Sequence, residues 1–285
     1  MEVKPLLQSQ PIAMIDTQYE YLDAYLDELR SRGRYTFKSD EIIEEFNLSD
    51  NAFKKTTQRL LQQHRISRLR KEFYLIIPPE FSARQTLPLG YFVDELMKFL
   101  DRDYYVGLLT AAMYHGAAHQ QPQSQFIVAE PPSLRPIKNR QQSIVFCLKK
   151  EWRREDVTQQ KTDAGYFNIS NPALTALDLV FYSDRIGGIN RAATVLTELS
   201  LELEANMLNK TAKAFPQTTS LQRLGYLLEE VIQETTLADV LYESLNVRKY
   251  YPTQLNPKTE SENQKAPNRW KIIPNMKVEV EILNA

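Results

Sequence analysis

Residues 39–77, SDEIIEEFNLSDNAFKKTTQRLLQQHRISRLRKEFYLII, decide the fold of the first part of the chain. Apolar residues recur here at intervals of three and four, which predicts two short helices joined by a turn. Ser39 and Ser49 stand where helix N-caps are expected, and acidic residues that suit a helix N-terminus follow each of them. The stretch therefore predicts a helix-turn-helix.

Two β-prone runs follow the second helix. Residues 66–69 and 73–77 flank a charged turn, and this pattern predicts a β-hairpin. Pro78-Pro79 should end the hairpin, because proline donates no hydrogen bond to a neighbouring strand. An amphipathic run over residues 17–32, followed by Gly33, predicts a preceding helix. Together these elements have the order of a winged helix-turn-helix domain.

Charge is segregated along this part of the chain. Residues 16–48 hold nine acidic and four basic residues, a balance of −5. Residues 49–71 hold seven basic residues and one acid, Asp50, a balance of +6. The whole chain has a net charge of only −1, so the segregation, rather than the composition, indicates a nucleic-acid partner. The alternative is a solvated helix face followed by an edge hairpin protected by charge.

The candidate DNA-binding residues are those of the second helix and the hairpin that could reach phosphates or base edges. We expect the lysines and glutamines of the helix to face the major groove, and the basic residues of the wing to contact phosphates or the minor groove. The candidates are Lys54, Lys55, Gln58, Arg59, Gln62, Arg65, Arg68, Arg70 and Lys71.

Length and composition set the remaining expectations. A chain of 285 residues, 42% apolar and 25% charged, fits a globular protein of two domains. We expect an α+β chain with a winged helix-turn-helix over residues 1–80 and a larger mixed α/β domain over 89–285, which could be subdivided near 206–220. A single cysteine, a polar N-terminus and no long apolar run indicate a cytoplasmic protein without a membrane segment.

The second domain is predicted to begin with helices and continue with strands. The apolar run 104–116 predicts one buried helix, and the change to a period of two after Pro122 predicts strands. Further helices are expected from Asn171, from Asn190 to 203, and over 221–233 and 237–245. Closing strands are expected at 270–273 and 277–282.

Metal chemistry is not favoured by the sequence. His115 and His119 are four residues apart and would share a helix face, but zinc needs further ligands and Cys147 is the only thiol. The chain has no HExxH or CxxC motif. Packed or hydrogen-bonded histidines are the favoured interpretation.

Catalytic chemistry is not favoured either. Asp178 lies in an otherwise apolar helix and could be catalytic, but a side chain that faces solvent or pairs with arginine is favoured. Trp152 is followed by two arginines, although neighbouring acids neutralise them and favour a surface turn. Gly187-Gly188 indicates a break between helices and not a phosphate loop. We therefore expect no catalytic residue, cofactor or metal.

Several motifs resemble the AbiEi antitoxins, the transcriptional regulators of type IV toxin–antitoxin (abortive infection) systems, and they span about residues 17–280. In the wing, Glu72 stands where this family often has glycine, so the turn could differ in type. The similar stretches are QRLL at 58–61, RISRL at 65–69, FYL at 73–75, YYVGLLTAAMYHG at 104–116, LTALDL at 174–179, QRLGYLLE at 222–229 and NRWKII at 268–273.

The resemblance implies a function in phage defence. Such antitoxins neutralise a nucleotidyltransferase-like toxin without a tight complex, and their winged domains repress their own promoters at inverted repeats. This chain lacks the GS…DxD arrangement of the toxin's metal-dependent chemistry. Three alternatives stay open: a neutralising module confined to about 91–285, an enzyme using His115, His119 or Asp178, and a ligand-responsive winged-helix repressor unrelated to a toxin.

Overall fold

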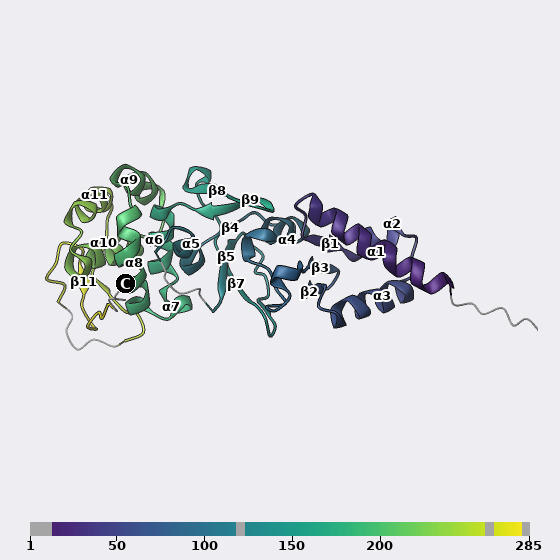
Figure 1. Cartoon of the computed structure of the whole chain (residues 1–285). Coiled ribbons are helices and arrows are strands. Elements are labelled where there is room, and N and C mark those ends of the chain that lie inside the picture. Colours follow the sequence, from purple (N-terminus) through teal and green to yellow (C-terminus); the bar gives the residue numbers. More distant parts are fainter. Residues whose placement is uncertain (1–12, 118–122, 260–264, 281–285) are drawn as a thin grey trace, which may run out of the picture. The chain divides into compact units, whose positions relative to one another are not determined.

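The computed structural model describes residues 13–117, 123–259 and 265–280 (Figure 1). It divides into two compact units. The first contains the chain up to Phe99 together with Lys161–Gly165, and the second contains Leu100–Gln160 and the chain from Tyr166 onward. Each unit combines helices with a sheet, so the predicted α+β class is confirmed.

The first unit has the element order of a winged helix-turn-helix, as predicted. Its sheet is antiparallel with the order β1-β3-β2. The elements in chain order are α1 (Ala13–Ser31), β1 (Thr36–Lys38), α2 (Ser39–Glu45), α3 (Asp50–Gln62), β2 (Ile66–Arg70) and β3 (Phe73–Ile76), followed by α4 (Val93–Phe99).

One apolar cluster holds α1, α2 and α3 to the sheet of this unit. Phe37 of β1 stacks on Tyr74 of β3, with ring centroids 5.1 Å apart, and Phe53 of α3 meets the same tyrosine edge-on. Burial of side chains of this size stabilises a fold by about 1.5–3 kcal/mol each. The buried members are Leu22, Leu26, Leu29, Phe37, Ile42, Phe53, Leu60, Ile66, Tyr74 and Ile76.

The two predicted helix caps have different outcomes. Ser49 caps α3, because its side chain accepts a hydrogen bond of 3.3 Å from the Ala52 amide. The prediction for Ser39 is wrong: the N-cap of α2 is Lys38, whose amide donates to the Glu41 carboxylate. Ser39 is instead the first helical residue, and its amide donates to the Glu72 carbonyl at 3.1 Å, which ties α2 to the wing.

The wing turn consists of Lys71 and Glu72 between β2 and β3. Glu72 has φ = +66°, in the left-handed region that favours glycine. The turn therefore keeps the backbone shape that glycine would permit, although the residue is glutamate. Left-handed backbone costs a residue with a side chain about 1–2 kcal/mol. The β2–β3 register shifts between Arg68 and Arg70, which marks a bulge next to the turn.

The second unit is built on a six-stranded mixed sheet with the order β6-β7-β5-β4-β9-β8. β4 pairs antiparallel with β5 and parallel with β9, while β5 pairs parallel with β7. The strands are β4 (Tyr104–Val106), β5 (Gln125–Ala129), β6 (Ile137–Lys138), β7 (Ser143–Leu148), β8 (Val157–Thr162) and β9 (Gly165–Ser170).

Helices complete this unit and share one large core with the sheet. α5 packs against β5 and α6, and α10 packs against both α6 and α11. The helices are α5 (Leu108–Tyr114), α6 (Pro172–Phe181), α7 (Ser183–Ile186), α8 (Ile189–Leu199), α9 (Ala205–Ala214), α10 (Thr218–Tyr226), a π-helical continuation (Leu227–Ile232) and α11 (Thr235–Asn246). The short strands β10 (Thr253–Gln254) and β11 (Ile272–Ile273) pair in parallel.

Several predicted elements need correction. The run 104–116 is not one helix, because its β-prone start forms β4 and Gly107 caps α5. A Cβ atom at Gly107 would lie 3.0 Å from the Val128 side chain. Glycine therefore fits between β4 and α5, where a larger residue would crowd Val128. The closing strand at 270–273 shrinks to β11, and residues 277–280 form no strand. β8 and α9 were not predicted.

Candidate functional site

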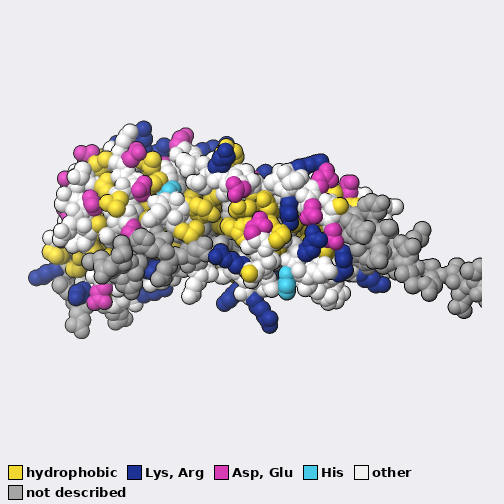
Figure 2. Space-filling view, viewed as in Figure 1, with side chains coloured by type: hydrophobic (Ala, Val, Ile, Leu, Met, Phe, Trp, Pro, Cys, Tyr) yellow, Lys and Arg dark blue, Asp and Glu magenta, His cyan; other side chains and the backbone are white. Residues whose placement is uncertain are grey.

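α3 has one buried and one exposed face, as its sequence predicts. Phe53, Thr56, Thr57 and Leu60 are buried against the first unit's core. The exposed side chains are those of Asp50, Asn51, Lys54, Lys55, Gln58 and Gln62. Figure 2 shows Lys and Arg side chains over this part of the molecule. The described structure therefore leaves the ammonium and amide groups of the helix available to an external partner.

Two of the candidate arginines are occupied within the unit. Arg59 of α3 bonds to Asp23 at 3.1 Å, and Arg65 bonds to Asp23 at 2.9 Å and to Asp27 at 3.3 Å. Both carboxylates lie on α1. These ion pairs link α1 to the end of α3 and the start of β2. The sequence did not indicate this role, because 36 or more positions separate the paired residues.

The wing residues differ in exposure. The side chains of Arg68 and Lys71 are exposed, and Lys71 makes an ion pair of 3.2 Å with its neighbour Glu72. Arg70 is partly buried, and burial lowers the pKa of its guanidinium. Arg68 and Lys71 are thus the wing cations that solvent reaches most easily.

The second unit contains a buried ion pair between Lys149 and Asp178. Lys149 Nζ lies 2.7 Å from Asp178 Oδ1, and the hydroxyl of Tyr105 donates to Asp178 Oδ2 at 2.6 Å. Asp178 is fully buried and Lys149 is 7% exposed. The prediction that Asp178 faces solvent or pairs with arginine is therefore wrong. The reason is that α6 is buried along nearly all its length, and the lysine comes from the end of the β7 strand.

The groups around this pair have raised pKa values, chiefly because they are buried. Burial, followed by the Asp178 charge, raises the pKa of Tyr105 well above its ordinary value. Burial raises the pKa of Cys147 to about 11, so its thiol stays protonated near neutrality. Burial also raises the pKa of Tyr182, whose hydroxyl donates to the Leu148 carbonyl at 2.8 Å. These protonated groups suit a structural cluster better than a nucleophilic one.

The histidine candidates are not brought together by any described contact. His115 Nε2 lies 2.7 Å from the Ser170 carbonyl oxygen, and burial lowers the pKa of the ring. It follows the last residue of α5, and His119 lies outside the described residues. Among the described residues, no group of three or more His, Cys, Asp and Glu side chains could hold a metal ion.

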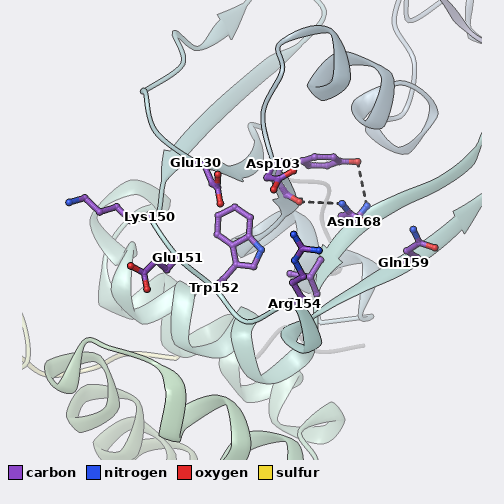
Figure 3. Close-up of a pocket in the computed structure, with 10 residues that line it drawn as sticks. Asp103, Glu130, Lys150, Glu151, Trp152, Arg154, Gln159 and Asn168 are labelled. Atoms are coloured by element: carbon purple, nitrogen blue, oxygen red, sulfur yellow. Dashed lines mark hydrogen bonds between the residues drawn. The ribbon is translucent and has the colours of Figure 1, made fainter.

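Two cavities open near Trp152 in the second unit. The larger has a volume of about 640 Å³, and its polar lining mixes three carboxylates with two cations. Figure 3 shows the Trp152 indole beside Glu130, while the Lys150 side chain points away. The lining residues are Asp103, Tyr104, Glu130, Lys150, Glu151, Trp152, Arg154, Val157, Gln159 and Asn168.

The smaller cavity, of about 200 Å³, has Lys149 in its wall. Its apolar surface comes from Trp152, Leu174, Ala214, Phe215 and Pro216. Its polar surface comes from Lys149, Glu151, Arg153, Asp156 and Thr211. Sequence reasoning missed this cavity, because its walls come from the end of β7, α6 and α9. The available signal was a lysine at the end of an apolar strand.

The region that holds the buried pair and the smaller cavity matches a known family. Residues 105–230 match the model of the AbiEi antitoxin C-terminal domain. This segment is similar to the AbiEi antitoxin C-terminal domain. The predicted resemblance is thereby confirmed over that range. Lys149, Asp178 and every residue that lines the smaller cavity lie within the range that matches AbiEi, and the helix-turn-helix and wing precede that range along the chain.

A solved structure extends the similarity of fold beyond the AbiEi domain. The crystal structure of the RV2827C protein from Mycobacterium tuberculosis superposes with a TM-score of 0.62 and 14% identity, covering 89% of this chain and 90% of that one. At this identity the match shows the fold alone. No curated protein matches the chain. None of the helices in the described ranges is long and apolar enough to cross a bilayer.

Proposed function

We propose that this chain is the cytoplasmic antitoxin of a type IV toxin–antitoxin system. In this role it neutralises a nucleotidyltransferase-like toxin and represses its own promoter by binding DNA. The supporting observation is an AbiEi antitoxin C-terminal domain on the same chain as a winged helix-turn-helix unit. No catalytic residue is part of the proposed function.

For repression, α3 enters the major groove of the operator, whose half-sites are arranged as inverted repeats. Lys54, Lys55, Gln58 and Gln62 reach base edges and phosphates, since all four are exposed on one helix. Arg68 and Lys71 reach the backbone from the wing. Arg59 and Arg65 position α3 through their ion pairs with α1.

For neutralisation, the part from about residue 89 to the C-terminus acts without forming a tight complex with the toxin. The AbiEi match supports this assignment, because its range begins after the winged helix-turn-helix elements and shares only Lys161–Gly165 with the first unit. A fragment that lacks residues 1–88 is then expected to rescue cells from the toxin while losing repression. A folded fragment that fails to rescue would show that neutralisation needs DNA binding.

Repression is tested by gel shift on the DNA upstream of the gene. The double variant Lys54→Ala/Lys55→Ala should weaken binding at moderate salt, whereas Arg84→Ala/Lys98→Ala is the matched control. The control removes the same charge from the first unit outside α3. Binding that is equal in the wild type and the α3 variant would contradict the assignment of α3.

A second function has one observation in its favour. A ligand-responsive winged-helix repressor needs a small-molecule site, and the cavity beside Lys149 could provide one. Co-expression with a nucleotidyltransferase-like toxin encoded by a neighbouring gene separates the two functions. Rescue supports the antitoxin, and repression without rescue supports the ligand-responsive repressor.

A further inference from the structure

The Lys149 ammonium is buried but has hydrogen-bonding capacity left over. An ammonium group carries three N–H donors. Among the described residues, Asp178 is its one hydrogen-bond acceptor, and the Phe215 ring lies with its centroid 4.4 Å away. A buried donor without an acceptor is costly, so an acceptor atom placed here would be bound favourably. The adjoining cavity is the space from which such an atom can approach.

The cavity walls suit a planar ring. Trp152 and Phe215 contribute aromatic surface, while Leu174 and Ala214 complete an apolar lining. Trp152 is fixed edge-on to Tyr105 with a centroid distance of 5.1 Å. Phe215 is held through its carbonyl, which accepts a hydrogen bond of 2.7 Å from Arg248. Both rings are therefore positioned before any ligand arrives.

Volume limits the size of the ring. An apolar cavity of about 150 Å³ in another protein binds benzene. The volume of about 200 Å³ found here therefore accommodates one six-membered ring with small polar substituents. Glu151, Ala214 and Pro216 are exposed, so the cavity opens to solvent on their side and a larger substituent could extend outward.

The charged side chains around the cavity favour a neutral, polar ligand. Lys149 and Arg153 contribute two positive charges, but Glu151 and Asp156 in the wall and Asp178 behind Lys149 contribute three carboxylates. An anionic ligand would add a further negative charge, and a cationic ligand would face the Lys149 ammonium. A neutral ring with a carbonyl oxygen satisfies Lys149 without either penalty. Asp156 Oδ1 already accepts hydrogen bonds from Thr211 at 2.7 Å and Asn171 at 3.4 Å, so Oδ2 is the Asp156 oxygen for a ring N–H.

We propose that the cavity between Lys149, Trp152 and Phe215 binds a pyrimidine nucleobase, whose carbonyl oxygen accepts a hydrogen bond from Lys149. The base can come from a free nucleoside or from single-stranded nucleic acid, because the open side leaves room for the sugar outside. Base binding does not depend on toxin neutralisation, so the two functions can fail separately.

The test uses the full chain and saturation-transfer NMR with uracil as the probe. We expect saturable binding with a Kd on the order of 0.1–1 mM for so small a ligand. Ala214→Trp fills the cavity and should weaken binding at least about tenfold. Lys213→Trp, at the neighbouring position of α9 but outside the cavity lining, is the matched control and should bind as the wild type does.

A second variant tests the role of the ammonium. Lys149→Met/Asp178→Leu removes both charges together, so no buried charge is left unpaired, and it should also lose uracil binding. If this variant does not fold, the Ala214→Trp comparison still decides. Absence of saturable uracil binding up to about 10 mM would overturn the inference. So would binding retained by Ala214→Trp, or benzoate that binds as tightly as uracil.

Uridine and a short oligouridine identify the source of the base. Oligouridine that binds more tightly than uridine, with the gain lost in Ala214→Trp, indicates a base presented by single-stranded nucleic acid. Equal binding of the two supports a free nucleoside. Failure of both while uracil binds would contradict a nucleobase ligand, because the sugar could not then pass the open side.

Discussion

The indole ring of Trp270 occupies the space in which a side chain at Gly225 would begin. A Cβ atom at Gly225 would lie 2.1 Å from the Trp270 ring, far inside contact distance. Trp270 is fully buried, and its Nε1 donates to Glu229 at 2.5 Å. The helix backbone at Gly225 thus packs directly against the ring of Trp270, which lies 45 positions later in the chain.

Gly225→Ala should destabilise the second unit, even though alanine favours helix by about 1 kcal/mol. The methyl group would overlap the ring, and overpacking of this kind costs about 1–3 kcal/mol. Urea unfolding followed by circular dichroism measures the change. In a Trp270→Ala background the same substitution should cost much less, and equal costs in both backgrounds would contradict the contact.

Lys149→Met should lower the free energy of unfolding by about 3–5 kcal/mol, because it leaves the buried Asp178 carboxylate without its cation. Lys149→Met/Asp178→Leu should recover most of that loss, since neither charge remains. Thermal unfolding of the two variants and the wild type makes the comparison. A double variant no more stable than the single one would show that the loss does not come from an unpaired Asp178 carboxylate.

Glu72→Gly should stabilise the first unit by up to about 1 kcal/mol, because glycine adopts the left-handed backbone of the wing turn without strain. Glu72→Ala is the matched control: it removes the same charge but keeps the strained φ. Denaturant unfolding separates the backbone effect from the charge effect. Equal stability of the two variants would mean that strain at this position is negligible.

Cys147 should resist alkylation in the native protein at pH 8. Its pKa is raised from the ordinary range to about 11, so the protonated thiol predominates below that pH and the reactive thiolate is scarce. The side chain is also buried. Iodoacetamide labelling followed by mass spectrometry should show reaction only after denaturant is added. Rapid labelling of folded protein would indicate local opening of β7.

The winged unit was predictable because its information is local. The spacing of Phe53, Leu60 and the intervening polar residues sets both the helix and its exposed face. The cap at Ser39 was misplaced because β1 runs directly into α2. The Ser39 amide is satisfied by the Glu72 carbonyl of the wing and not by a capping side chain. Local patterns do not contain such a contact.

The site in the second unit was not predictable for the same reason. Lys149 and Asp178 are 29 positions apart, and the residues next to each of them in the sequence do not indicate that the two side chains pair. The strand β4 was missed because three β-prone residues precede a longer helical run, and pairing with β5 and β9 decides their conformation. Motif order still located the AbiEi domain, since residue types at many positions contributed together.

The ion pairs from Arg59 and Arg65 to α1 limit how strongly salt can act on DNA binding. Of the seven basic residues between 49 and 71, these two have carboxylate partners on α1, Asp23 and Asp27, so at most five can replace counterions. Only cations that replace counterions on phosphate contribute to the salt slope, at about 0.9 per contact. The slope from this stretch is then at most about −4.5 per protomer, against about −6.3 if all seven took part. Two aspartates of α1 thus bind these arginines where DNA phosphates would otherwise bind.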